Sequence, residues 1–161
     1  MPLLLARIDD RLVHGQVAYG WGKALRPSLF VIVSDALRED PDRAGLYLFA
    51  VPEGARGRVL SVSEALDPAF CAEMDLERTL LLLPGTEEAL RLVDGGFPVR
   101  ELNLGGLHYA AGKRESLPYL FLDETDRSRL LSIARRGIKI AAQDLPSNPA
   151  HPIEALLGGG A

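Results

Sequence analysis

Residues 79–85, TLLLLPG, place four consecutive leucines between a threonine and a proline–glycine turn. Residues 29–35, LFVIVSD, have the same design, with an unbroken apolar run that ends in two polar residues. A strand with one face in water alternates apolar and polar side chains, whereas a run without alternation is typical of a strand buried on both faces. The two stretches therefore predict central strands of a sheet that has helices on both faces.

Short apolar runs and segments of helical periodicity alternate along the rest of the chain. Further strands are predicted at LLLARI (3–8), RVLSV (58–62), VRELNL (99–104) and IKIAAQ (138–143). Helices are predicted at about 15–25, 41–50, 63–74, 86–94, 123–136 and 152–157, with Ser63, Thr86 and Asp123 as N-caps. Strands that alternate with helices form parallel sheets. The length of the chain is that of one domain, so residues 1–161 are predicted to form a single domain. We expect an α/β fold with an open, mainly parallel, doubly wound sheet.

Composition limits the classes of protein to which the chain can belong. Of the 161 residues, 47% are hydrophobic and 25% are charged, as in globular proteins that fold around one core. The net charge of -4 argues against general binding of nucleic acid, which requires a basic excess. Cys71 is the only cysteine, so we expect no internal disulfide and no cysteine metal cluster. With no apolar run of about 18 residues or more, the sequence predicts a cytoplasmic protein without a signal peptide.

Polar residues and glycines follow several of the predicted strands. In an open parallel sheet, ligands bind at the carboxyl ends of the strands, where the N-termini of helices converge. This rule selects 9–15 after the first strand, Ser34 and Asp35 after the second, Pro84 and Gly85 after the fourth, and 103–106 after the fifth. We expect a site for a small polar or anionic group at this edge of the sheet.

Residues 7–16, RIDDRLVHGQ, carry the strongest chemical signal. His14 lies directly before Gly15 and a predicted helix, whose first N–H groups lack partners within the helix and attract anions. Arg11 can present two parallel N–H groups to phosphate oxygens. A neutral imidazole is also a good nucleophile near neutral pH. The three features together predict an acceptor of phosphoryl groups.

Two carboxylates in the same stretch need a separate explanation, because they would repel a phosphate. Asp9 or Asp10 can hold an arginine, or can fix the tautomer of His14 by a hydrogen bond to one ring nitrogen. We assign the second role to Asp10. Charged loops after strands are common, so a structural cluster of ion pairs with His14 packed against it explains the spacing equally well.

A family resemblance favours the chemical interpretation. RIDDRLVHGQVAYGW, residues 7–21, resembles the signature of the mannose/fructose/sorbose-family IIB component of the bacterial phosphoenolpyruvate-dependent sugar phosphotransferase system (PTS). The resemblance continues, in the order of the family, through VIVSDALREDPDRAGLYLFAVPEGARGRVLSVSEAL, LLLPGTEEALRLVDGG and ELNLGGLHYAAGK. It therefore extends over nearly the whole chain.

The resemblance implies a function and a set of site residues. Such proteins are cytosolic phosphotransferase components that take a phosphoryl group from a IIA component and pass it to a sugar at the membrane components IIC and IID. It implies phosphorylation of His14 at Nδ1, with Arg11 stabilising the phosphoryl charge and no cofactor. Supporting positions are expected in the loops around this histidine: Gly15, Gln16, Ser34, Asp35, Asn103, Gly105 and Gly106.

Other kinds of site fit the residues less well than a phosphoryl acceptor. No metal site is predicted, since Asp10 and His14 lack further ligands at metal-binding spacing, and GGLHYAAGKR (105–114) fails the spacing of a nucleotide-binding loop. His108 is expected at the edge of the site, with a supporting role left open. The alternative function is a non-transporting regulatory or phosphate-ligand-binding module on the same fold. The oligomeric state stays open, with Tyr19, Trp21 and Tyr109 as candidate contacts of a homodimer.

Overall fold

A computed structural model describes residues 3–157 of the chain, which fold around one large sheet. Its strands are β1 (Leu3–Asp9), β2 (Leu29–Val33), β3 (Arg56–Leu60), β4 (Thr79–Leu83), β5 (Glu101–Gly106), β8 (Lys139–Ala142) and β9 (His151–Pro152). Their spatial order is β3-β2-β4-β1-β5-β8-β9, and every neighbouring pair is parallel except β8 and β9. The predicted open, mainly parallel sheet is confirmed.

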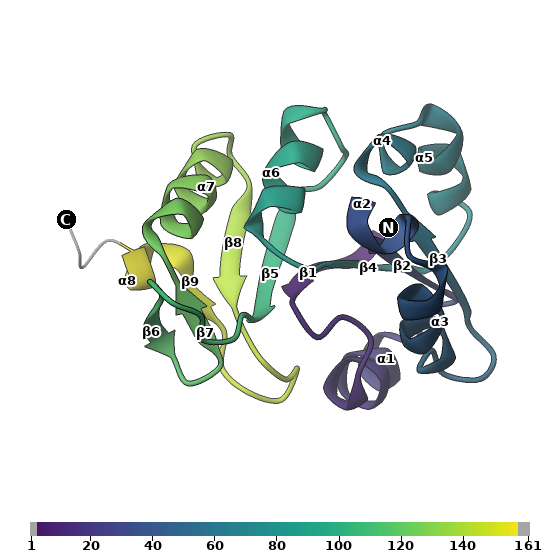
Figure 1. Cartoon of the computed structure of the whole chain (residues 1–161), viewed down its shortest axis with the longest axis horizontal. Coiled ribbons are helices and arrows are strands. Elements are labelled where there is room, and N and C mark those ends of the chain that lie inside the picture. The colour runs from purple at the N-terminus through teal and green to yellow at the C-terminus, as the bar shows by residue number, and fades with distance from the viewer. Residues whose placement is uncertain (1–2, 158–161) are drawn as a thin grey trace.

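Helices cover both faces of this sheet. They are η1 (Gln16–Trp21), α1 (Gly22–Leu25), α2 (Asp35–Arg38), α3 (Pro41–Phe49), α4 (Val62–Ala65), α5 (Pro68–Met74), α6 (Thr86–Asp94), α7 (Glu124–Ala134) and α8 (Ile153–Leu157). Helices α4 to α7 lie on one face, and α1 and α3 lie on the other (Figure 1). This is the doubly wound arrangement that the alternating pattern predicted.

The apolar runs form the core as expected. Every residue of β2 and of β4 is buried, which agrees with their lack of alternation. Side chains of α4 to α8 pack on one face of the sheet around Ile8 and Leu104. On the other face, η1 and α2 pack around Phe30 and Leu82. No side chain of β5 or β8 belongs to this second cluster. On the face that carries η1, the helices therefore leave β5 and β8 uncovered.

Local hydrogen bonds divide one predicted helix and replace two predicted N-caps. The helix predicted at 63–74 is divided into α4 and α5, because Asp67 caps a new helix that has Pro68 at its first position. Ser61, not Ser63, caps α4, and it forms a reciprocal capping box with Glu64. Thr86 does not cap α6, since its buried hydroxyl donates to Asp126 Oδ1 at 2.7 Å. Asp123 caps α7 as predicted.

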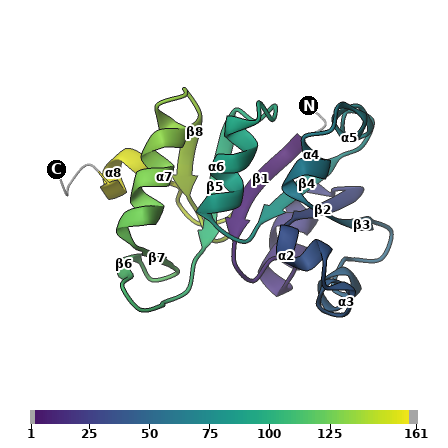
Figure 2. The ribbon, with the colours of Figure 1, turned by 45° about the horizontal axis from the view of Figure 1, so that its top comes forward.

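A small antiparallel hairpin was not predicted. It consists of β6 (Arg114–Leu117) and β7 (Leu120–Leu122), and it lies at one end of α7 (Figure 2). Its strands are short and β6 is largely exposed, so neither contains the apolar run that marks a central strand. Leu107 forms a bridge to Leu120 and joins the hairpin to the end of β5.

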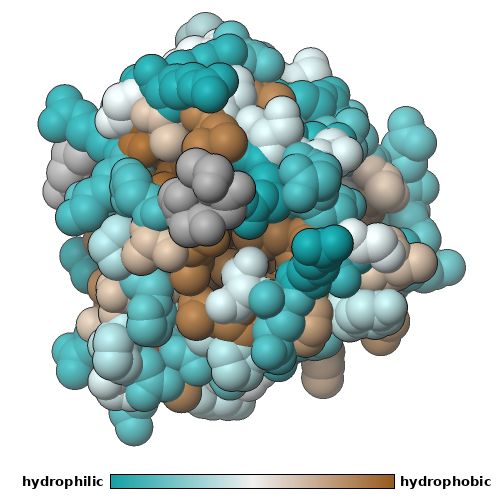
Figure 3. Space-filling model, turned by 90° about the vertical axis from the view of Figure 1, so that its left-hand side faces the viewer, coloured by the Kyte–Doolittle hydropathy of each residue, from teal (hydrophilic) through white to brown (hydrophobic). Residues whose placement is uncertain are grey.

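One face of the molecule is mostly polar. Seen from the side of α8 and β9, hydrophilic side chains cover most of this face, and a hollow between them has a hydrophobic floor (Figure 3). Within residues 3–157, no helix has the length and apolar character needed to cross a membrane.

Candidate functional site

Strand β1 ends in two charged side chains that are buried side by side. Arg7 and Asp9 are two residues apart in an extended strand, so they project on the same face of the sheet. Both are 0% exposed, and Arg7 Nη2 lies 3.2 Å from Asp9 Oδ2. A buried charge is costly unless it is paired and hydrogen-bonded. Each of the two groups therefore depends on the other.

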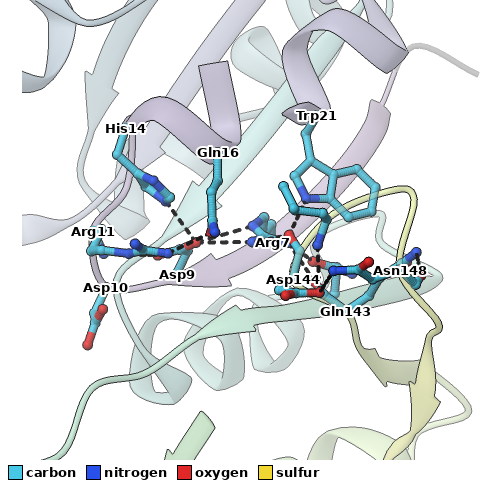
Figure 4. A network of polar contacts seen from close by, with 12 residues as sticks. Arg7, Asp9, Asp10, Arg11, His14, Gln16, Trp21, Gln143, Asp144 and Asn148 are labelled. Carbon is cyan, nitrogen blue, oxygen red and sulfur yellow. Dashed lines mark hydrogen bonds and ion pairs between the residues drawn. The ribbon is translucent and has the colours of Figure 1, made fainter. Parts of the chain in front are cut away.

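Distant parts of the chain complete the hydrogen bonding of the Arg7 guanidinium (Figure 4). Arg7 Nη1 donates to Asn103 Oδ1 at 2.6 Å and to the Gln143 carbonyl at 2.8 Å. Arg7 Nη2 donates to the Asp144 carbonyl at 2.9 Å. The guanidinium also lies 5.3 Å from the centre of the Trp21 ring, within the range of a cation–π contact. Arg7 thus joins β1, β5, η1 and the segment after β8.

A glycine provides the space for this arginine. A Cβ atom placed on Gly105 would lie 2.0 Å from Arg7 Cζ, far inside van der Waals contact. At the neighbouring Gly106, the closest atom to such a Cβ would be Asp9 Oδ1 at 3.6 Å, an ordinary contact. Of the two adjacent glycines, only Gly105 is required by the packing of Arg7.

The loop after β1 turns back on Asp9. Asp9 Oδ1 accepts from the backbone N–H of Arg11 at 3.1 Å, and the Asp9 carbonyl accepts from the N–H of Leu12. Leu12 has a φ of 55°, in the left-handed region that residues with a Cβ rarely adopt, and its side chain is buried. This turn brings the ring of His14 back to Asp9, with His14 Nε2 3.1 Å from Asp9 Oδ2.

The contact with Asp9 fixes the tautomer of His14. An ionised carboxylate can only accept hydrogen bonds, so the proton of a neutral His14 ring belongs on Nε2. Nδ1 then carries the lone pair, and it has no hydrogen-bond partner among residues 3–157. The His14 side chain is 17% exposed, so a reactant can reach it. Nδ1 is thus the nucleophilic atom of this ring.

The charges around Asp9 keep it ionised. Burial by itself raises the pKa of the Asp9 carboxyl, but the hydrogen bond from His14 and the positive charge of Arg7 outweigh it and bring the pKa below its ordinary value. Burial lowers the pKa of the Arg7 guanidinium, and the charge of Asp9 opposes that shift. Since an arginine does not lose its proton under physiological conditions, both groups remain charged.

Arg11 lies beside the same histidine. Its Nη2 donates to Gln16 Oε1 at 2.8 Å, and its Nε lies 3.7 Å from Asp9 Oδ1. Arg11 Nε is buried without a hydrogen bond in the described part of the chain. Gln16, the first residue of η1, therefore holds one end of the guanidinium, while Nε stays free beside Asp9, whose other oxygen contacts His14.

The backbone near His14 adds further donors. The N–H groups of Val13, His14 and Gly15 donate to no acceptor within residues 3–157. Gly15 is exposed and a Cβ there would meet nothing within 4 Å, so this side of the loop is open. Unpartnered N–H groups at the start of a helix, with a guanidinium nearby, attract an anion. The arrangement suits a phosphoryl group on His14.

The structure corrects the role given to Asp10. Its carboxylate does not contact His14, because Asp9 occupies that position. Asp10 instead accepts from the backbone N–H of His108 at 2.7 Å and lies 2.6 Å from His108 Nδ1. Alternation along the strand explains the difference: Asp9 shares the face of Arg7 and η1, whereas Asp10 points away from it. His108 is exposed, and its contact with Asp10 fastens the segment after β5 to the loop after β1.

The supporting positions separate into two groups. The first group lies on β5, beside β1. In it Asn103 accepts from Arg7, Gly105 leaves the space for Arg7, and Gly106 lies near Asp9. Ser34 and Asp35 follow β2, which β4 separates from β1. Ser34 caps α2, and Asp35 accepts from the N–H of Val62 and from Arg91, so the hydrogen bonds of this pair do not join them to His14. Within residues 3–157, no group of three or more His, Cys, Asp or Glu side chains could hold a metal ion.

Comparison with known proteins agrees with this geometry. Residues 3–160 match the family described as "PTS system sorbose subfamily IIB component". The chain belongs to this family. The N-acetylgalactosamine-specific phosphotransferase enzyme IIB component 2 of Escherichia coli is 32% identical over 158 residues, which cover 98% of this chain and 100% of that protein.

One further relative is similar in sequence, and one solved structure is similar in fold. The mannose-specific EIIAB component of Escherichia coli is 32% identical over 149 residues, which cover 92% of this chain and 46% of that protein. The crystal structure of the IIBSor domain of the sorbose permease from Klebsiella pneumoniae superposes with a TM-score of 0.92 at 28% identity. That superposition covers 100% of this chain and 99% of the IIBSor domain. Residues 3–157 thus have the fold of a PTS IIB component.

Sequence reasoning missed the central position of Arg7. Arg7 and Asp9 are two residues apart at the end of the first predicted strand, so the sequence already indicated that their side chains lie on the same face of the sheet. Nothing in the sequence indicated Gln143 and Asp144, because their backbone carbonyls, not their side chains, bind Arg7. Trp21, a candidate contact of a homodimer in the sequence, is buried here, and its indole N–H donates to the Asp144 carbonyl at 2.8 Å.

Proposed function

We propose that this PTS IIB component is a phosphocarrier in which His14 Nδ1 accepts a phosphoryl group and passes it to a sugar. The observation that carries the proposal is the contact between His14 Nε2 and Asp9, which leaves Nδ1 as the nucleophile. Arg11 and the free N–H groups of Val13, His14 and Gly15 support it, because they can balance the negative charge of the phosphoryl oxygens.

Asp9 also suits the charge that develops on the ring. When Nδ1 bonds to phosphorus, the bond from phosphorus to the donor breaks, and Nε2 keeps its proton. The His14 ring then becomes positively charged, and the buried Asp9 carboxylate stabilises it. Phosphoryl transfer requires mainly positioning and charge stabilisation, so the residues near His14 suffice without a cofactor.

The partners follow from the family and from one relative. The mannose-specific EIIAB component joins an A and a B component in one protein, and this supports a IIA component as the phosphoryl donor. Transfer onward to a sugar would take place at membrane components IIC and IID, with which the protein would associate from the cytoplasm. Gly15 lies on the open side of the His14 loop, where both partners must approach.

Intact-mass analysis tests the proposal. The protein is incubated with phosphoenolpyruvate, the general phosphotransferase proteins and a IIA component, and we expect a gain of one phosphoryl group that is labile in acid and stable in base. His14→Gln should abolish the gain while keeping the fold. His108→Gln and His151→Gln are matched controls, since these are the other two of the three histidines, and both should be phosphorylated normally. Full phosphorylation of His14→Gln would refute the proposal.

A further inference from the structure

A cavity of about 620 Å³ lies on the part of the sheet that η1 and α1 leave uncovered. Sites for small molecules commonly have volumes of about 300–1,000 Å³. The apolar lining comes mainly from β1, from the helix that follows it and from the segment before β5: Leu3, Leu5, Trp21, Leu25 and Val99. Asn103 of β5 and Gln143 after β8 add two carboxamides to this lining.

The Asn103 carboxamide has a free donor at this cavity. Asn103 is 9% exposed, and its side-chain Oδ1 accepts from Arg7 Nη1 at 2.6 Å. Since a guanidinium can only donate, this contact fixes which end of the amide is oxygen. Asn103 Nδ2 then has no acceptor within residues 3–157. An amide nitrogen without a partner on the wall of a cavity is free to donate to a ligand atom that accepts a hydrogen bond.

Gln143 offers the complementary group. Its Nε2 donates to the carbonyls of Asn148 at 2.8 Å and of Pro146 at 3.4 Å, which fixes the orientation of this amide as well. Gln143 Oε1 therefore remains as an acceptor. The backbone N–H of Gln143 donates to the Leu104 carbonyl, so one carboxamide projects from β5 and the other from the residue directly after the adjacent strand β8. A head group that both accepts and donates a hydrogen bond would match the pair.

These features select the chemical class of the ligand. An alcohol or a carboxamide both donates and accepts, whereas a carboxylate only accepts and an ammonium only donates. The leucines and Trp21 require an apolar body next to that head group. Arg100, Glu101 and Lys139 also line the cavity, but they are exposed and of mixed sign, so they do not demand a charged ligand.

The cavity and His14 share one network of contacts. Asn103 Oδ1 and the Gln143 carbonyl both bind Arg7 Nη1, and Arg7 Nη2 binds Asp9 Oδ2. The same Asp9 oxygen lies 3.1 Å from His14 Nε2. Trp21, which also lines the cavity, is the last residue of η1, and His14 lies two residues before Gln16, the first residue of that helix. A ligand that moves either carboxamide or Trp21 therefore changes the surroundings of His14.

We propose that this cavity is a regulatory site for a neutral small molecule with an apolar body and an alcohol or carboxamide head group. Its occupation acts on the His14 ring through Arg7 and Asp9. The proposal concerns the hydrogen bonding of the unphosphorylated His14 ring. It therefore goes beyond the proposed phosphocarrier function and does not depend on it.

Nuclear magnetic resonance of the ¹⁵N-labelled protein tests the site, with cyclohexanol as the probe. We expect saturable shifts of the Trp21 indole N–H and of the Asn103 side-chain amide. Cyclohexanecarboxylate, which has the same apolar body but cannot donate, should bind more weakly. Ala141→Phe should abolish the shifts, because Ala141 lines the cavity and a phenyl ring would fill it, whereas Ala111→Phe on an exposed loop should not.

A second pair of measurements tests the head-group contact and the coupling. Asn103→Asp keeps an acceptor for Arg7 but loses the free donor, and we expect cyclohexanol to bind about fivefold to tenfold more weakly. At saturation, the ¹⁵N shifts of the His14 ring nitrogens should change in the unmodified protein and stay constant in Ala141→Phe.

Four outcomes of the ligand experiments would overturn the proposal. They are the absence of cyclohexanol binding, equal binding in Ala141→Phe, equal affinity for the carboxylate, and a His14 ring that does not respond at saturation. Shifts of Trp21 on dilution of the protein alone would instead assign the surface to a second copy of the chain, and would overturn it too. None of these results depends on phosphorylation, so failure of this proposal and failure of the phosphocarrier function are distinguishable.

Discussion

Replacement of Gly105 by alanine tests whether the buried Arg7 network holds the site together. The new Cβ would lie 2.0 Å from Arg7 Cζ, 2.2 Å from Nε and 2.3 Å from Nη2, so the guanidinium must leave its position. It would then lose its contacts with Asn103 and with Asp9, whose charge would stay buried without its partner. Breaking a buried ion pair in this way typically costs about 3–5 kcal/mol.

The size of the effect can be measured by thermal and urea denaturation. For a chain of this length, about 1 kcal/mol corresponds to a change in Tm of about 2–4 °C, so we expect Gly105→Ala to lower the Tm by about 6–20 °C. Gly106→Ala is the matched control on the same strand. Its Cβ would meet Asp9 Oδ1 at an ordinary 3.6 Å, and we expect its free energy of unfolding to change by less than about 1 kcal/mol.

A double variant separates a collision with Arg7 from any other effect of the new methyl group. In an Arg7→Ala background, the atoms that Gly105→Ala would strike are absent, so the substitution should cost less than about 1 kcal/mol. The same cost in both backgrounds would refute the reasoning. So would a Gly105→Ala protein that is as stable as Gly106→Ala.

Three further predictions concern charged groups. Asp9→Asn should slow phosphorylation of His14 by about 10²–10⁴-fold, because the ring loses the carboxylate that fixes its tautomer; the rate is measured by quench and mass analysis on protein shown to be folded. Arg11→Lys should slow transfer by about tenfold to a thousandfold with little change in Tm, and normal transfer in Arg11→Met would reject a role for Arg11 in binding the phosphoryl group. Burial raises the pKa of Glu88, whose Oε2 is buried without a partner among residues 3–157. Ionisation of this carboxyl is therefore less favourable in the folded protein than in the unfolded one, so the free energy of unfolding should fall as pH rises through the raised pKa. Urea denaturation should therefore show Glu88→Gln to be more stable than the unmodified protein at pH 7 and equally stable at pH 3.

The sequence by itself determined the architecture, because burial leaves a local record. The runs at 29–33 and 79–83 lack alternation, and the structure buries every residue of both. Parallel strands joined by helices leave few possible topologies, and their carboxyl ends share one edge of the sheet. His14, Gly15 and Arg11 could also be named from the sequence, since their relation is local and the loop keeps them within a few residues of each other.

Only the tertiary structure decided which groups surround the histidine. Local spacing allowed either Asp9 or Asp10 to hold His14, and strand direction with the packing of η1 chose Asp9, while His108 engaged Asp10. Three partners of Arg7 lie 96, 136 and 137 positions away along the chain, and two of them are backbone carbonyls, which have no residue-specific signal in a sequence. The need for glycine at 105 has the same origin: it arises from the side chain on the adjacent strand, and only the register between β1 and β5 brings the two together.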